Sequence, residues 1–205
     1  MYDKRTSSLW STLHGKPVIG PLVDKGIQLK RRSVVTTTWG DWSRRHPDST
    51  VLSLNTGFQR NYDEGAAYRD YFATDRKMFL TPLDDERLPN KREVLALRAD
   101  DGSNPVAIDT AFLRGHPVYQ LTVGQDRVVV LTTPSGESRV FEAGGTRFES
   151  WDGSATARDT QGRDWQMDES ELRHQDSQQK LPRYPSHQSF WFGWHAQFPD
   201  TQLIQ

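Results

Sequence analysis

A repeated segment constrains the fold of this 205-residue chain more than any other feature, because residues 29–52 align without a gap with residues 181–204. Each copy contains two tryptophans three positions apart, followed by a Pro-Asp pair. The matched residues are Trp39, Trp42, Pro47 and Asp48 in the first copy and Trp191, Trp194, Pro199 and Asp200 in the second. Because such a pattern rarely recurs by chance, we predict two related halves, residues 1–92 and residues 93–205.

Each copy predicts one short helix that bears the tryptophans. The two tryptophans and the residue at His46 or Phe198 are spaced as i, i+3 and i+7, which places them on one helical face. Thr37 or Thr38 can cap the first helix and Ser189 the second. The proline that follows would end each helix.

Short strands are predicted through most of the remaining sequence. In the first half, apolar residues indicate a hairpin within residues 2–10 and strands at 17–22, 27–36 and 51–54, and residues 82–91 form a connecting loop. The second half alternates short apolar runs with Gly, Asp and Pro turns, with predicted strands at 94–98, 106–108, 118–123, 127–133, 138–141, 146–151, 155–158, 163–167 and 202–204. The predicted fold is mainly β (α+β), with two halves of short antiparallel strands in a sandwich or a partly open barrel.

The two halves are unequal in length. The β-rich stretch at 93–152 precedes the second copy, and nothing in the chain corresponds to it before the first copy. Either the first half evolved without those strands, or the chain lacks an N-terminal part. We expect the second alternative, so that residues 1–92 are an incomplete half.

Composition narrows the classes of function. The formal net charge is −1, so no global basic field favours nucleic acid. Cysteine is absent, which excludes disulfides and thiolate chemistry within these residues. The sequence has no apolar run long enough for a transmembrane segment.

The most ligand-like segment is aromatic and charged and has no counterpart in the second half. Its candidate binding residues are Arg60, Tyr62, Tyr68 and Tyr71. Such residues could contact a ligand, or they could hold a loop against the body of the protein.

Other residue patterns favour structural roles. The tryptophan pairs could form platforms for a sugar, but helical spacing favours faces buried against sheets. Each Pro-Asp pair is interpreted as a helix terminus, where proline ends the helix and the aspartate bonds nearby backbone amides, rather than as paired catalytic carboxylates. The run Lys30-Arg31-Arg32 is interpreted as a solvated face, with Arg31, which recurs as Arg183, forming an ion pair or a bond to the backbone.

No pattern predicts a catalytic residue or a cofactor. The histidines are dispersed, without metal-ligand spacing, and no phosphate-binding loop, nucleophile elbow or dinucleotide fingerprint is present. We therefore predict no metal site within these residues.

Several short motifs together resemble the domain-of-unknown-function family 3179. They include Met1-Tyr2-Asp3, Ser8-Leu9-Trp10, Ile19-Gly20-Pro21-Leu22, Thr37-Thr38-Trp39, His46-Pro47-Asp48 and Arg87-Leu88-Pro89. The resemblance implies an extracytoplasmic setting, periplasmic or membrane-anchored. It also implies an upstream segment with a Cys-Pro-Leu-Cys-like motif, which is not in this chain.

Three hypotheses of function follow. The first is a non-catalytic extracytoplasmic module that binds a small ligand or a protein. The alternative is a metal- or thiol-dependent protein whose reactive motif lies in an N-terminal segment of a longer form. The third and weakest hypothesis is a hydrolase that uses the aspartates and histidines of this chain.

Overall fold

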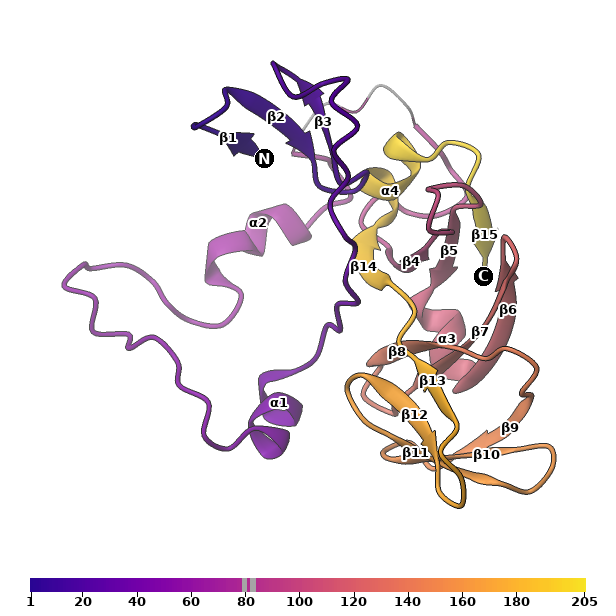
Figure 1. Cartoon of the computed structure of the whole chain (residues 1–205). Helices are drawn as coiled ribbons and strands as arrows, with labels where there is room; N and C mark the ends of the chain where they lie inside the picture. Colours follow the sequence, from indigo (N-terminus) through magenta and orange to yellow (C-terminus); the bar gives the residue numbers. More distant parts are fainter. Residues whose placement is uncertain (79–80, 82–83) are drawn as a thin grey trace.

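The computed structural model describes residues 1–78, 81 and 84–205. These residues form 15 strands in four sheets with a few short helices, and none of the sheets closes into a barrel (Figure 1). The prediction of a mainly β, sandwich-like fold is therefore confirmed.

The four-stranded sheet at the centre of the body pairs strands from the C-terminal end of the chain with strands from its middle. Its strands are β4 (Glu93–Leu97), β5 (Val106–Asp109), β14 (Ser186–Phe190) and β15 (Gln202–Ile204). Their order is β14-β4-β5-β15, so the antiparallel hairpin β4–β5 lies between the two C-terminal strands. β15 runs parallel to β5, unlike the other pairs. Helix α4 (Trp191–Gln197) connects β14 to β15.

A three-stranded sheet packs against this sheet to form the main core. Its strands are β6 (Val118–Val123), β7 (Asp126–Thr132) and β8 (Ser138–Glu142). Leu95 and Ile108 from the first sheet meet Val128 and Val140 from the second, and each of these side chains is at most 1% exposed. The short helix α3 (Thr110–Gly115) follows β5 and is capped by Asp109, whose carboxylate accepts from the Ala111 amide at 2.9 Å.

A five-stranded sheet continues the body at its other end. It contains β9 (Phe148–Trp151), β10 (Thr156–Asp159), β11 (Asp164–Met167), β12 (Glu171–His174) and β13 (Lys180–Pro182). Its core is centred on Trp165, which is fully buried and donates from its indole to the Asp159 carboxylate at 3.0 Å.

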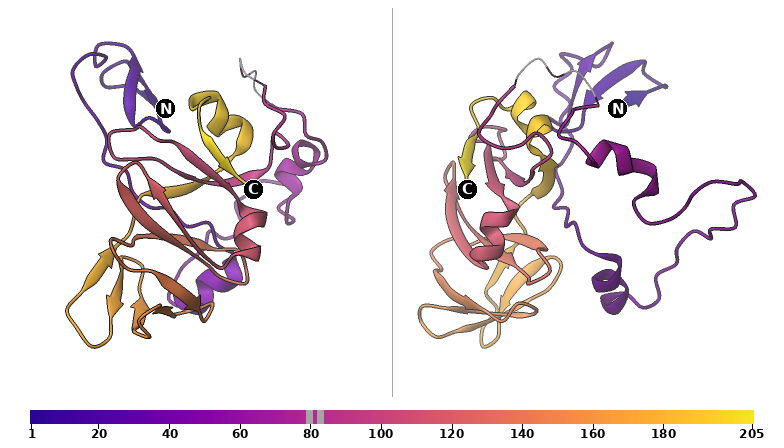
Figure 2. Two further views of the ribbon diagram at one scale, coloured as in Figure 1. Left: turned by 90° about the vertical axis from the view of Figure 1, so that its right-hand side faces the viewer. Right: turned by 180° about the vertical axis from the view of Figure 1, so that it is seen from behind.

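The first half of the chain lies outside this body. Strands β1 (Tyr2–Asp3), β2 (Ser8–Ser11) and β3 (Lys16–Ile19) form a small sheet, followed by α1 (Trp39–Arg45), the 3-10 turn η1 (Ala66–Tyr68) and α2 (Arg69–Phe72). Figures 1 and 2 show the small sheet next to α4, a segment that descends alongside β14 to α1, and a long arm that stands away from the body.

Two strand predictions in the first half are wrong. Residues 27–36 and 51–54 are not strands, although their sequences are apolar enough. A strand forms only where a neighbouring chain satisfies its backbone groups, and in the described structure only Val34 donates a main-chain bond to the body, to the Ser186 carbonyl at 2.8 Å. The sequence shows where a strand could form, but it does not show whether a partner is present.

Smaller differences concern the helices and the connecting loop. Thr38 caps α1 as predicted, by accepting from the Asp41 amide at 3.1 Å, but Ser189 does not cap α4, where Phe190 occupies the N-cap without a side-chain bond. Helix α3 and strands β12 to β14 were not predicted. The predicted loop at 82–91 lies partly outside the described residues.

Candidate functional site

The two tryptophan-bearing helices have the same local geometry. Each has seven residues. The indole of Trp42 donates to the Ser49 hydroxyl at 2.9 Å, and that of Trp194 donates to the Thr201 hydroxyl at 2.8 Å. The ring at His46 lies 4.0 Å from that of Trp42, and the ring at Phe198 lies 4.3 Å from that of Trp194.

The surroundings of the two helices differ. Trp191 and Trp194 are fully buried, as the interpretation of buried faces required. Trp39 and Trp42 are 55% and 41% exposed, so for the first helix that interpretation is wrong. The physical reason is that no sheet lies over α1 in the described structure, whereas β4 and β5 lie over α4.

The predicted binding residues of the arm are spread over two places. Tyr62 bonds to the Thr56 hydroxyl at 2.7 Å, and Arg60 lies over the Phe58 ring at 5.9 Å. Tyr68 and Tyr71 instead lie at α2, where they are in edge contact at 6.4 Å.

Tyr71 is held by Lys91, which lies just before β4. The ammonium of Lys91 lies 3.8 Å from the centroid of its ring and also bonds to its carbonyl. Phe72, the next residue, contacts Phe190 at the start of α4. The arm thus contacts itself at one place and the body at another, and its role in binding stays a prediction.

The Pro-Asp pairs stand at helix termini. The amides that follow are bonded to main-chain carbonyls, Ser49 to His46 and Thr201 to Phe198, both at 3.1 Å. The expected bonds from backbone amides to the carboxylates of Asp48 and Asp200 are absent among the described residues, so that part of the interpretation is wrong. The same residues contain no group of three His, Asp or Glu close enough to hold a metal ion.

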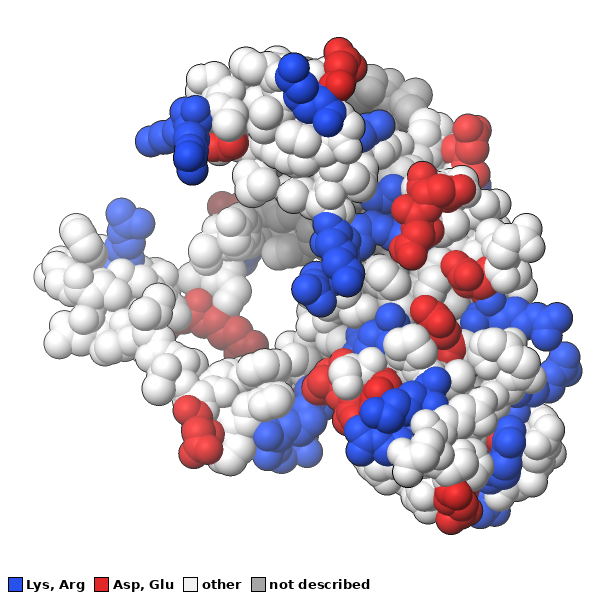
Figure 3. Space-filling view, viewed as in Figure 1, with Lys and Arg blue, Asp and Glu red and all other residues white. Residues whose placement is uncertain are grey.

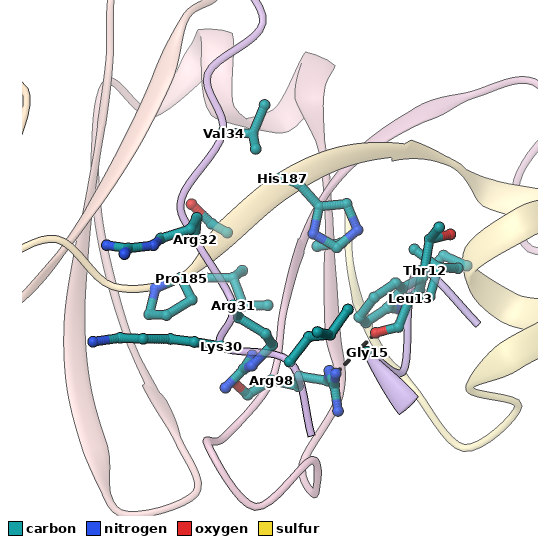
Figure 4. A pocket seen from close by; sticks show the side chains of 15 residues that line it. Thr12, Leu13, Gly15, Lys30, Arg31, Arg32, Val34, Arg98, Pro185 and His187 are labelled. Carbon is teal, nitrogen blue, oxygen red and sulfur yellow. Dashed lines mark hydrogen bonds between the residues drawn. The ribbon is translucent and has the colours of Figure 1, made fainter. Parts of the chain in front are cut away.

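A pocket of about 470 Å³ lies where the two halves of the chain meet (Figure 4). Its floor is the edge of the central sheet, from β4 and β14, and its roof is residues 29–34 of the first half. Apolar residues line part of it, namely Leu13, Leu29, Val34, Ala96, Leu97, Pro185 and Trp194.

Four cations line the same pocket: Lys30, Arg31, Arg32 and Arg98. No carboxylate is among the described residues that line it. Lys30 and Arg32 are exposed, and Arg98 is only 5% exposed. Figure 3 shows Lys and Arg side chains gathered on this face, below the small N-terminal sheet.

The two inner arginines are fixed by backbone carbonyls. Arg98 donates to the carbonyls of Leu13 at 2.8 Å and His14 at 3.2 Å. Arg31 donates to the carbonyls of Arg98 at 3.0 Å and Ala99 at 2.9 Å. Arg31 also pairs with the Asp100 carboxylate at 2.7 Å. The prediction that Arg31 forms an ion pair or a backbone bond is confirmed, and these bonds fasten the roof to the floor.

Besides the Ser186 hydroxyl, the imidazole of His187 is the buried polar group of the pocket that lacks a partner among the described residues. Its side chain lies in edge contact with Trp194 at 5.7 Å, and its Nε2 atom is buried with no hydrogen-bond partner among the described residues. Burial lowers the pKa of His187, and the nearby charges of Arg98 and Arg31 lower it further. A buried ring nitrogen without a partner is costly unless a ligand or water bonds to it.

This arrangement suits an anion with an apolar body. The cations and the free imidazole nitrogen can bind a carboxylate or a phosphate, and the apolar side chains can contact the rest of the ligand. Among the described residues that line the pocket, no hydrogen bond joins a nucleophile to a base.

Sequence reasoning did not identify this pocket. Its lining comes from three separate segments, near residues 13, 30 and 97, and from a fourth at 185–194. Only the run Lys30-Arg31-Arg32 gave a signal, and that run was interpreted as a solvated face.

The described residues define a mainly β, sandwich-like protein with a pocket lined by cationic and apolar side chains. Comparison with family models matches residues 1–201 to "Protein of unknown function (DUF3179)", so the chain belongs to this family, as its motifs indicated. No curated protein and no solved structure matches it. No helix in the described part of the chain is long and apolar enough to cross a bilayer.

Proposed function

We propose that this protein is a non-catalytic binding module in an extracytoplasmic setting, and that its pocket binds a small anion with an apolar body. The observation that carries the proposal is a pocket with four cations, no lining carboxylate among the described residues, and the unpartnered imidazole of His187. The setting rests on family membership alone.

The position of the pocket also supports the interpretation that the chain consists of two related halves. Its floor belongs to the second half and its roof to the first. The main-chain bond from Val34 to Ser186 joins residues at the same position of the two aligned segments. We infer that the halves are two copies of one unit that meet at this point and that the ligand binds between them.

A test compares two probes of the same shape, 2-naphthoate and the uncharged 2-naphthylmethanol, by isothermal titration calorimetry. We expect the acid to bind at least tenfold more tightly than the alcohol, because the cations interact with the carboxylate and not with the hydroxyl. The Lys30→Gln/Arg32→Gln variant should bind the acid more weakly and the alcohol equally well. Both side chains are exposed, so the fold should be unaffected.

The matched control is Lys25→Gln, which removes an exposed charge outside the lining. Equal affinity of the two probes would contradict an anion site. A loss of affinity in the control as large as in the double variant would show that long-range charge, and not the pocket, attracts the acid.

A further inference from the structure

Helix α1 and its flanking segments expose an apolar surface that the corresponding part of the second half buries. Trp39 and Trp42 are 55% and 41% exposed, and Val51 and Leu52 after the helix are 68% and 95% exposed. On a neighbouring face of the helix, Arg45 binds the buried Glu137 carboxylate at 2.7 and 3.0 Å. The charged face therefore holds the helix on the body, and the tryptophan face is left uncovered.

The second half shows what covers such a face. The tryptophans of α4 pack on small aliphatic side chains of the β4–β5 hairpin, Val94, Ala96 and Ala107, which are at most 1% exposed. The hairpin also pairs with the strands on both sides of α4, antiparallel to β14 and parallel to β15. One hairpin therefore provides hydrogen-bond partners for two strand edges and also covers the tryptophan face of the helix.

The first half contains the outer parts of this arrangement without the central hairpin. By the alignment, residues 34–38 correspond to β14 and residues 50–52 to β15. Neither segment is a strand, and no described strand lies between them. Because α1 and α4 share their length and their indole bonds, the same kind of hairpin would fit both.

We propose that residues 34–52 bind a two-stranded β-hairpin of a partner polypeptide, with small aliphatic residues on the face toward Trp39 and Trp42. One strand of the hairpin pairs antiparallel with residues 34–38 and the other pairs parallel with residues 50–52. A second copy of this chain is a poorer occupant, because its own β4–β5 hairpin is already paired on both sides. The inference does not rest on the proposed ligand, although Val34 belongs both to this segment and to the pocket lining.

The test supplies the hairpin at high effective concentration. A second copy of residues 88–115 is joined to Met1 of the full chain through a Gly/Ser linker of about 30 residues, whose reach is roughly 30 Å. Hydrogen exchange is then followed by mass spectrometry. We expect exchange at 34–38 and 50–52 to slow at least tenfold relative to the unfused chain, with unchanged protection in β14, which reports that the body stays folded.

Two variants make the result specific. Val94→Asp with Ala107→Asp, placed only in the added hairpin, should abolish the slowing. Trp39→Ala with Trp42→Ala in the chain should do the same, and Arg44→Ala on the same helix, with a side chain 76% exposed, should not. The proposal is overturned if the added hairpin leaves exchange at 34–38 and 50–52 unchanged or if the Asp-bearing hairpin slows it equally. It is also overturned if the unfused chain becomes protected there as its concentration rises, which would identify a second copy as the occupant.

Discussion

At the scale of single residues, we expect His187 to respond to an anion in the pocket. Its Nε2 atom has no described partner, and burial, Arg98 and Arg31 hold its pKa below the usual value. An anion bound beside it would counteract those positive charges and raise the pKa. Binding of the anion would therefore be linked to uptake of a proton.

We expect the affinity for 2-naphthoate to increase as the pH falls from 7 to 5. The bound carboxylate favours imidazolium, so the complex takes up a proton that the free protein does not hold. Titrations at several pH values measure the slope. His187→Gln should flatten the pH profile, and a profile of unchanged slope in this variant would place the titrating group elsewhere.

At the scale of elements, α1 and α4 show that the same local sequence can be buried or exposed. Helix length, N-cap region and tryptophan spacing follow from residues within the segment, and these could be predicted. Burial depends on β4 and β5, which are far from α4 in sequence and have no counterpart over α1 among the described residues. The spacing of apolar residues indicates which face of a helix is suited to burial. It cannot indicate whether another element covers that face.

Alanine at the two corresponding tryptophans should have different effects on stability. Trp194→Ala removes a fully buried indole and its bond to Thr201, so we expect a loss of about 3–5 kcal/mol in the free energy of unfolding. Trp42→Ala removes a side chain that is 41% exposed, and we expect a loss below about 1 kcal/mol. Urea denaturation measures both. Equal losses would mean that α1 is covered in solution.

At the scale of the whole molecule, one buried ion network holds the first half on the body. Glu137, at 2% exposure, accepts hydrogen bonds from Thr37 and Arg45 of the first half and from the buried Arg139 at 2.9 Å. Burial alone would raise the pKa of Glu137, but the bonds from Arg45, Thr37 and Arg139 outweigh it and lower the pKa to about 2.

The lowered pKa predicts an acid-sensitive part of the stability. Because the folded pKa is below the unfolded one, Glu137 contributes above about pH 4.5 and loses its contribution as the pH falls toward 2. The contribution at neutral pH is about 3 kcal/mol. Stabilities of the wild type and Glu137→Gln should therefore differ at pH 6 and converge near pH 2. Glu64→Gln, at an exposed position of the arm, is the control, and a constant difference across this range would contradict the assignment.

Sequence reasoning succeeded where structure is local and failed where it depends on distant segments. The turns between the strands of residues 93–167 identified most of that meander, because Gly, Asp and Pro act within a few residues. The pocket depends on Arg98, Arg31 and His187 meeting from three parts of the chain, and no motif links them. Segments 27–36 and 51–54 have the composition of strands, but no described strand pairs with either of them.

The roof of the pocket has a consequence for the rate at which a ligand could leave. Residues 29–34 lie outside every described strand and helix, and a few bonds from Arg31, Ser33 and Val34 fasten them to the body. Such a segment can lift while the sandwich beneath it stays folded. The residence time of a bound molecule would then be set by how often these few bonds open together, so weakening them should shorten occupancy even where the contacts to the ligand are unchanged.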